Sequence, residues 1–147
     1  MNLKRSVHIS RSYPYPPEVI WEALSDPTIL ARWFLANEFE PRVGHRFQFQ
    51  DTPKPGFDGV IESEVTVVER PHRLAYTFTS SLLDTVVTFI LKEQGEGTLL
   101  ELDHRGFQGL KAVSLSFLLG SGWKSLLSKR LAAVLQNTDA EGATRGS

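Results

Sequence analysis

The 147-residue chain carries 16 basic and 17 acidic side chains, 41% hydrophobic residues and no cysteine. This length suits one domain with a sizeable core, and the composition excludes disordered, fibrous and disulfide-stapled chains and thiolate metal sites. The net charge of −1, without an evident basic stripe, gives no support for a nucleic-acid partner.

The chain shows no signal-like or membrane-spanning segment. Its N-terminus passes directly into an alternating pattern rather than an apolar signal core. The longest apolar stretch, Leu110 to Leu119, contains Lys111, Ser114 and Ser116 and is too short to cross a bilayer. We interpret it as a buried helix segment, and we expect a cytoplasmic protein with no stable membrane insertion.

The first part of the chain predicts a strand and two short helices. Val7, Ile9 and Tyr13 alternate with polar residues, as in a half-buried strand. Pro16-Pro17 is typical of a helix start. Asp26-Pro27 then indicates the end of that helix and the cap of a second one, from Thr28 to Phe34.

The middle of the chain predicts a series of strands separated by turn residues. Alternating or β-branched runs are bounded by the loop Pro53–Gly56, by Arg70-Pro71 and by the hairpin loop Glu93–Gly97. The predicted strands are His45–Phe49, Val60–Glu69, His72–Thr79, Thr85–Leu91 and Thr98–His104.

The last part of the chain predicts a long helix with one apolar face. Trp123, Leu127, Leu131, Val134 and Leu135 recur at helical spacing. This helix can begin as early as Leu110, with a kink near Gly120–Gly122.

The order of these elements predicts an α+β fold. This order fits an antiparallel sheet of about six to seven strands that curves around one long C-terminal helix, with two short helices after the first strand. We expect one such domain over residues 1–137 and a flexible tail over residues 138–147, which lacks apolar periodicity.

Three stretches together resemble a known family. They are Pro16–Pro27 with its continuation to Leu30–Phe34; Val65–Phe78; and Thr98–Phe107 followed by Gly122-Trp123 and Leu126-Leu127. In order and spacing they resemble the activator of heat-shock-protein-90 ATPase-like proteins, over roughly residues 7 to 136.

The resemblance implies a helix-grip fold and a ligand cavity. The family belongs to the superfamily of START domains, polyketide cyclases and the birch pollen allergen, whose members hold apolar ligands between sheet and long helix. Family members are mostly bacterial single domains. Eukaryotic co-chaperones of the family carry a further N-terminal domain that engages the chaperone, whereas this sequence starts directly at the helix-grip part.

Strand alternation predicts which side chains would line such a cavity. Aromatic and aliphatic residues from four strands, the second short helix and the long helix should face one another across the concave side of the sheet. The predicted lining is Trp33, Phe34, Phe47, Phe49, Leu74, Tyr76, Phe78, Val87, Phe89, Leu100, Leu102, His104, Trp123 and Leu127.

Tyr76 and His104 are the polar groups of this predicted lining. His104 either acts as a base or ligand contact or is a buried histidine whose hydrogen bonds are satisfied by backbone groups or water. Asp103 points to the opposite face of the strand and so forms no pair with it. The tryptophans are either core anchors or, for Trp33, part of a cavity rim. Glu62 and Glu64 share one face, which we expect to meet water.

Three functions remain open. The leading hypothesis is a binding or carrier protein for a small hydrophobic, aromatic or lipid-like molecule in a cavity of roughly 300–1,000 Å³. The alternatives are a cyclase- or hydratase-type enzyme using His104 and Tyr76, and a chaperone-interacting module whose surface is Leu110 to Leu119. We expect no catalytic residues and no cofactor. We also expect no metal, because the histidines lie on separate elements and no histidine or carboxylate pair has metal-ligand spacing on a helix.

Overall fold

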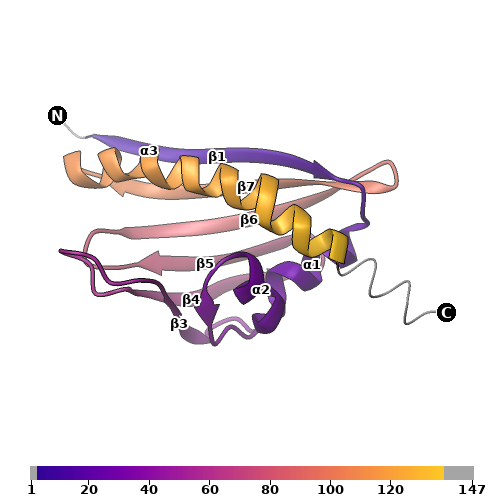
Figure 1. The fold of residues 1–147 in the computed structure, drawn as a ribbon, viewed down its shortest axis with the longest axis horizontal. Helices are drawn as coiled ribbons and strands as arrows, with labels where there is room; N and C mark the ends of the chain where they lie inside the picture. The colour runs from indigo at the N-terminus through magenta and orange to yellow at the C-terminus, as the bar shows by residue number, and fades with distance from the viewer. Residues whose placement is uncertain (1–2, 138–147) are drawn as a thin grey trace.

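The computed structural model describes residues 3–137, which form a seven-stranded antiparallel sheet with helices against its concave side (Figure 1). The tail 138–147, predicted to be flexible, lies outside the described residues. In chain order the elements are β1 (Lys4–Tyr13), α1 (Pro17–Ser25), α2 (Pro27–Trp33), β2 (Ala36–Asn37), β3 (Arg46–Gln50), β4 (Val60–Glu69), β5 (Arg73–Thr79), β6 (Asp84–Gln94), β7 (Gly97–Gln108), α3 (Leu110–Ser125) and the π-helical segment η1 (Leu126–Leu131).

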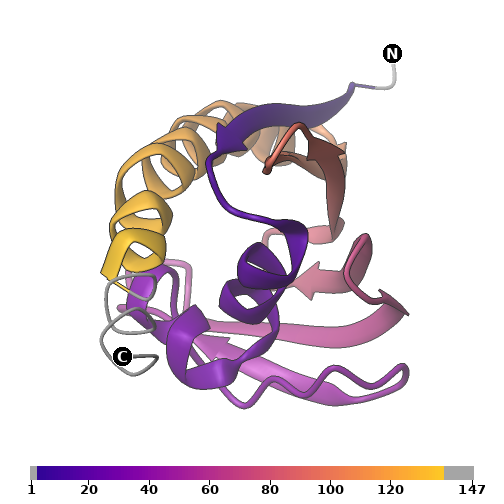
Figure 2. The same cartoon turned by 90° about the vertical axis from the view of Figure 1, so that its right-hand side faces the viewer.

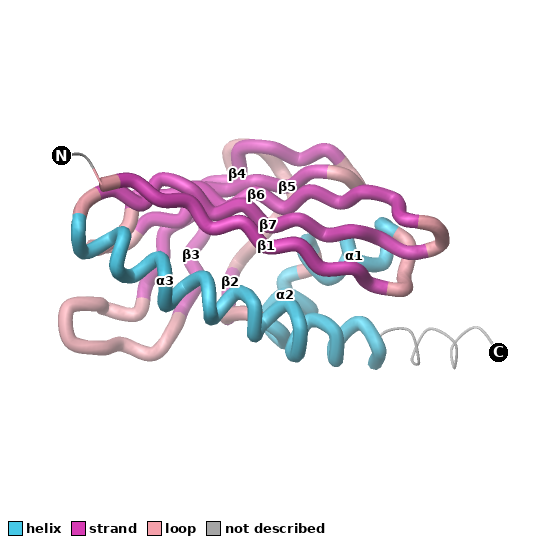
Figure 3. The backbone as a smooth tube through the Cα atoms, turned by 90° about the horizontal axis from the view of Figure 1, so that it is seen from above, coloured by secondary structure: helices cyan, strands magenta, loops and turns pink. Residues whose placement is uncertain are grey.

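The strands lie in the order β1-β7-β6-β5-β4-β3-β2, so the first strand pairs with the last and the sheet curls around the long helix. Seen end-on, the sheet and the helices enclose one interior (Figure 2). From above, α3 runs beside β1, and α1 and α2 lie towards the C-terminal end of the long helix (Figure 3). This arrangement confirms the predicted helix-grip α+β fold.

The two short helices follow from local chemistry. Pro17 occupies the first turn of α1, where no backbone donor is needed. The Asp26 carboxylate accepts hydrogen bonds from the amides of Thr28 and Ile29, at 2.9 and 3.1 Å, and so caps α2 as predicted. The Trp33 indole N–H donates to the carbonyl of Ala23 at 2.8 Å, which fixes α2 against α1.

Several sequence-based boundaries differ from the structure. β6 runs to Gln94 and β7 begins at Gly97, so the predicted hairpin loop Glu93–Gly97 shortens to Gly95-Glu96. β7 continues to Gln108, four residues past the predicted end at His104, because pairing with β1 outweighs the break in alternation at Arg105-Gly106. Gly106 passes this point with a φ of 107°, a conformation that favours glycine. The short strand Ala36–Asn37 was not predicted either.

The helix is continuous through Gly120–Gly122, where the sequence predicted a kink, and its irregular segment is the π-helical stretch Leu126–Leu131. The Tyr13 hydroxyl donates to the carbonyl of Leu127 at 2.7 Å, which ties β1 to this stretch. No local sequence pattern predicts the π-helical stretch or its hydrogen bond from Tyr13.

The interpretation of Leu110 to Leu119 as a buried segment is also only partly right. Leu110, Phe117 and Leu118 are 71%, 61% and 69% exposed. The buried side chains of α3 include Ala112 and Ser116. This half of the helix packs mainly on β1 and β7 at one edge of the sheet, so only a narrow face is covered.

Candidate ligand site between the sheet and the long helix

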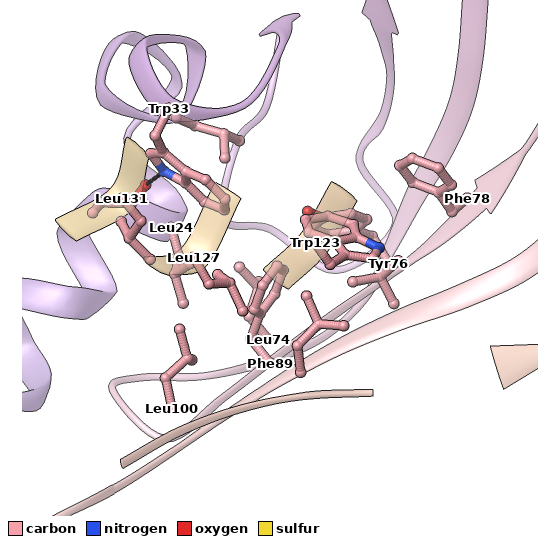
Figure 4. Packing of buried hydrophobic residues seen from close by; sticks show 14 of the residues in the cluster. Leu24, Trp33, Leu74, Tyr76, Phe78, Phe89, Leu100, Trp123, Leu127 and Leu131 are labelled. Carbon is pink, nitrogen blue, oxygen red and sulfur yellow. Dashed lines mark hydrogen bonds between the residues drawn. The ribbon is translucent and has the colours of Figure 1, made fainter. Parts of the chain in front are cut away.

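The predicted lining residues come together on the concave side of the sheet. Thirteen of the fourteen are buried, and Phe34 is partly buried against the same core. Strand register explains this: Val65, Tyr76, Val87 and His104 are successive partners across β4, β5, β6 and β7, so they form one inward row. Figure 4 shows Tyr76, Phe89 and Trp123 within this cluster.

Aromatic rings fill the centre of this space. The Phe34 ring lies 4.9 Å from the ring of Trp123, 5.0 Å from Phe49 and 5.7 Å from Trp33, measured between centroids. Phe78 packs behind them at 6.3 Å from Phe34. A ligand at this place must therefore displace side chains, with Phe34 the most accessible ring of the predicted lining.

Three surface pockets lie outside this aromatic interior. The largest, about 550 Å³, is on the outer face of β3–β5, where Glu62, Glu64 and Thr77 line it. A second, about 350 Å³, lies beside residues 80–84, and a third, about 300 Å³, lies between Tyr13 and the end of the long helix. This outer pocket is open to solvent, and most of its lining residues are polar or charged.

His104 is held by side chains from two other elements. The Thr85 hydroxyl donates to the carbonyl of Phe78 at 2.7 Å, so it accepts from His104 Nε2, also at 2.7 Å. The indole N–H of Trp123 donates to His104 Nδ1 at 3.0 Å. His104 is therefore the neutral tautomer with its proton on Nε2.

Burial also favours this neutral form. It lowers the pKa of His104 to about 4, although the nearby Asp103 carboxylate acts in the opposite direction. Both ring nitrogens are engaged by the protein, so a ligand contact or proton transfer at His104 requires Trp123 or Thr85 to move. Of the two sequence-based interpretations of His104, this geometry matches the one in which the protein itself satisfies both ring nitrogens.

Two other buried groups lack partners. Within the described part of the chain, the Tyr76 hydroxyl and the Ser63 hydroxyl are the buried side-chain oxygens without a hydrogen-bond partner. Burial raises the pKa of Tyr76, which keeps its hydroxyl protonated and able to donate. Both residues face inward from neighbouring strands and adjoin Phe47, which is the β3 partner of Ser63 and lies 5.7 Å from the Tyr76 ring.

Sequence reasoning found Tyr76 but missed Ser63. The sequence could have indicated Ser63, because Ile61, Ser63 and Val65 alternate with Glu62 and Glu64, and a period of two places Ser63 on the inward face. Phe39 was missed as well, although it is 1% exposed and packs on Phe47 and Tyr76. It lies in the connection after β2, where no periodic pattern points to burial.

The site does not resemble a metal centre. Across residues 3–137, no group of three histidine, aspartate or glutamate side chains is placed to hold a metal ion. The buried polar groups of the site are the Tyr76, Ser63 and Thr85 hydroxyls and the neutral His104, and the two partnerless hydroxyls suit hydrogen bonding to an uncharged ligand group.

A curved antiparallel sheet, a long C-terminal helix and an aromatic interior define a helix-grip protein. A family model for "Activator of Hsp90 ATPase homolog 1-like protein" matches residues 14–136. The chain belongs to this family. A search of curated proteins finds no significant match.

Solved structures of similar proteins agree with this assignment. The protein MLL2253 from Mesorhizobium loti is 31% identical with a TM-score of 0.82, and the match covers 91% of this chain and 98% of that one. BH1534 from Bacillus halodurans is 29% identical with a TM-score of 0.76, over 91% and 98% of the chains. PFC0360w from Plasmodium falciparum, described as an HSP90 activator, is 26% identical with a TM-score of 0.57, over 68% and 71%.

Proposed function

We propose that the protein binds a small apolar or aromatic ligand between the sheet and α3 and acts as a binding or carrier protein. The observation that carries this proposal is the pair of partnerless hydroxyls, Tyr76 and Ser63, within a shell of aromatic rings. A buried hydroxyl without a partner costs about 1–3 kcal/mol. A ligand polar group that reached either hydroxyl would recover that hydroxyl's share of the cost.

The ligand chemistry follows from the surroundings of these hydroxyls. Phe39, Phe47, Phe49 and Phe89 have ring centroids 5.6–6.2 Å from that of Tyr76, so the ligand body should be aromatic or lipid-like. One hydroxyl or carbonyl at its end would meet Tyr76. A charged headgroup is disfavoured there, because no lysine or arginine among the described residues is buried.

Entry would occur at Phe34. This residue caps the C-terminal end of the seven-residue helix α2, and its ring is the partly buried member of the aromatic cluster. An outward rotation of Phe34 would free the faces of Trp123 and Phe49 that it now covers. An aromatic ligand could then take the place of the Phe34 ring with little loss of packing.

The enzyme alternative is weaker on this geometry. A cyclase or hydratase needs an acid–base group that faces its substrate. His104 is occupied on both nitrogens and its pKa is lowered to about 4, and the Tyr76 hydroxyl has no base beside it. The chaperone alternative has one supporting feature, the exposed apolar residues of α3, which are considered below.

Replacing Tyr76 with phenylalanine separates the two roles of its hydroxyl. Without ligand, the variant should be as stable as the parent or more stable by up to about 1 kcal/mol, because a partnerless buried group is removed. Its affinity for hydroxyl- or carbonyl-bearing flavonoids should fall by about fivefold or more, since the ligand oxygen loses its partner. Urea denaturation and calorimetric titration measure the two effects.

The control is Tyr15→Phe, a partly buried tyrosine outside the aromatic cluster, which should leave flavonoid affinity unchanged. A loss of more than about 1 kcal/mol of stability in the ligand-free Tyr76→Phe variant would show that the hydroxyl already has a partner in the protein. That result would remove the main support for the site.

A further inference from the structure

One side of the molecule combines exposed apolar side chains with positive charge. The α3 patch, which we define as Leu110, Phe117 and Leu118, is 61–71% exposed. The spacing of seven and eight residues places all three on one face of the helix. Lys111 and Lys124 are exposed on the same face.

The charge around this patch is unbalanced, although the chain as a whole is nearly neutral. Residues 110–137 hold four basic residues and no acidic one, and residues 1–17 hold three basic residues and no acidic one. The seven are Lys4, Arg5, Arg11, Lys111, Lys124, Lys129 and Arg130. β1 and α3 pack side by side (Figure 3), so five of these basic residues, Lys4, Arg5, Arg11, Lys111 and Lys124, come from two neighbouring elements, and Lys129 and Arg130 follow in η1.

Arg5 joins the two features directly. Its guanidinium carbon lies 3.7 Å from the centroid of the Phe117 ring, and its Nη1 donates to the Ser116 hydroxyl at 2.8 Å. The nearest strand beyond β1 is β7, whose carboxylates are paired: Glu101 with Lys92 and Asp103 with Arg105. Within residues 3–137, Arg5 is thus a cation held over the apolar patch and forms no ion pair with a carboxylate.

We propose that this side of the protein docks on the surface of an anionic lipid bilayer, with Phe117 and Leu118 inserted at headgroup depth. Cations beside exposed Phe and Leu on one helix face are the features that hold a helix at such an interface. Basic side chains meet the negative surface potential of anionic lipids. The helices of residues 3–137 include none long and apolar enough to cross a membrane, so the attachment is peripheral.

A bilayer fits this surface better than a protein partner does. A stable protein interface buries about 800 Å² on each side and matches its partner in shape. The α3 patch is three side chains projecting from a convex helix, with serines between them, and none of the three surface pockets described above lies over it. A bilayer admits projecting side chains without requiring a complementary shape.

Vesicle flotation of the full chain tests this proposal. The protein should float with phosphatidylcholine vesicles that contain phosphatidylserine and much less with pure phosphatidylcholine, and added salt should weaken the binding. The double variant Phe117→Ser with Leu118→Ser should bind the anionic vesicles at least about tenfold more weakly. Lys111→Glu should also weaken binding and should do so most at low salt.

Two matched controls use residues outside this surface. Val43→Ser removes an apolar side chain that is 60% exposed in the connection between β2 and β3, and Lys54→Glu reverses a charge in the connection between β3 and β4. Both should bind the vesicles as the parent does.

Equal binding to neutral and anionic vesicles, or no loss in the Phe117→Ser, Leu118→Ser variant, would overturn the proposal. So would absence of vesicle binding together with self-association, seen by sedimentation, that this double variant abolishes. That last result would assign the patch to a protein interface instead. None of these outcomes bears on the ligand site, because the patch lies on the outer face of α3.

Discussion

Replacing Trp123 with alanine should lower the free energy of unfolding by about 3–5 kcal/mol. The side chain is 3% exposed, and its ring packs on Phe34 and Phe89 at centroid distances of 4.9 and 6.2 Å. Its N–H is also the donor to His104 Nδ1. The substitution removes both the packing of α3 on the sheet and the partner of a buried nitrogen.

Trp123→Phe separates the stability that comes from ring packing from the stability that comes from the indole hydrogen bond. It keeps much of the ring packing but removes the indole N–H, so it should cost about 1–3 kcal/mol, the penalty for leaving His104 Nδ1 unpaired. Urea denaturation of the three proteins gives both numbers. A loss below about 1 kcal/mol for Trp123→Ala would mean that the long helix does not hold the sheet through this residue.

Acid should destabilise the protein through His104. The ordinary histidine pKa is 6.5, and burial lowers the pKa of His104 in the folded state to about 4. The unfolded chain therefore binds a proton at a pH where the folded protein does not. Stability is fully present above about pH 6.5 and falls as the pH drops towards 4, by a total of about 3 kcal/mol.

The physical cause of this loss is the direction of the hydrogen bonds. Protonation would put a proton on Nδ1, opposite the indole N–H of Trp123, so two donors would face each other. His104→Gln removes the titrating group, and the difference in stability between parent and variant should therefore shrink as the pH falls from 6.5 to 4. His72→Gln, an exposed histidine outside this network, is the matched control. A parent-minus-variant difference that stays constant with pH would contradict the assignment.

Strand alternation predicted the interior well. In β5, Leu74, Tyr76 and Phe78 alternate with Arg73, Thr77 and Thr79, and all three point inward in the structure as period two requires. The capped start of α2 at Asp26 was equally readable, because the acceptor lies two or three residues from the amides it binds. Patterns within a few residues of one another determine these features.

The features that the sequence did not reveal depend on contacts between distant elements. His104 is satisfied by Thr85 and Trp123, each 19 residues away, and no local pattern pairs them. Leu110, Phe117 and Leu118 look like core residues until the position of α3 at the sheet edge is known. The positive side of the molecule likewise emerges only when β1 and α3 are placed together.

The central claim, that ligands enter between the sheet and α3, is tested most directly by isotope-edited NMR during titration with flavonoids and fatty acids. Shifts should concentrate on Phe34, Tyr76 and the indole N–H of Trp123, which do not line any of the pockets described above. The outer pocket of about 550 Å³ on β3–β5 is the competing location. Shifts clustered there, on Glu62, Thr77 and Thr79, with an unchanged Trp123 signal, would contradict the claim.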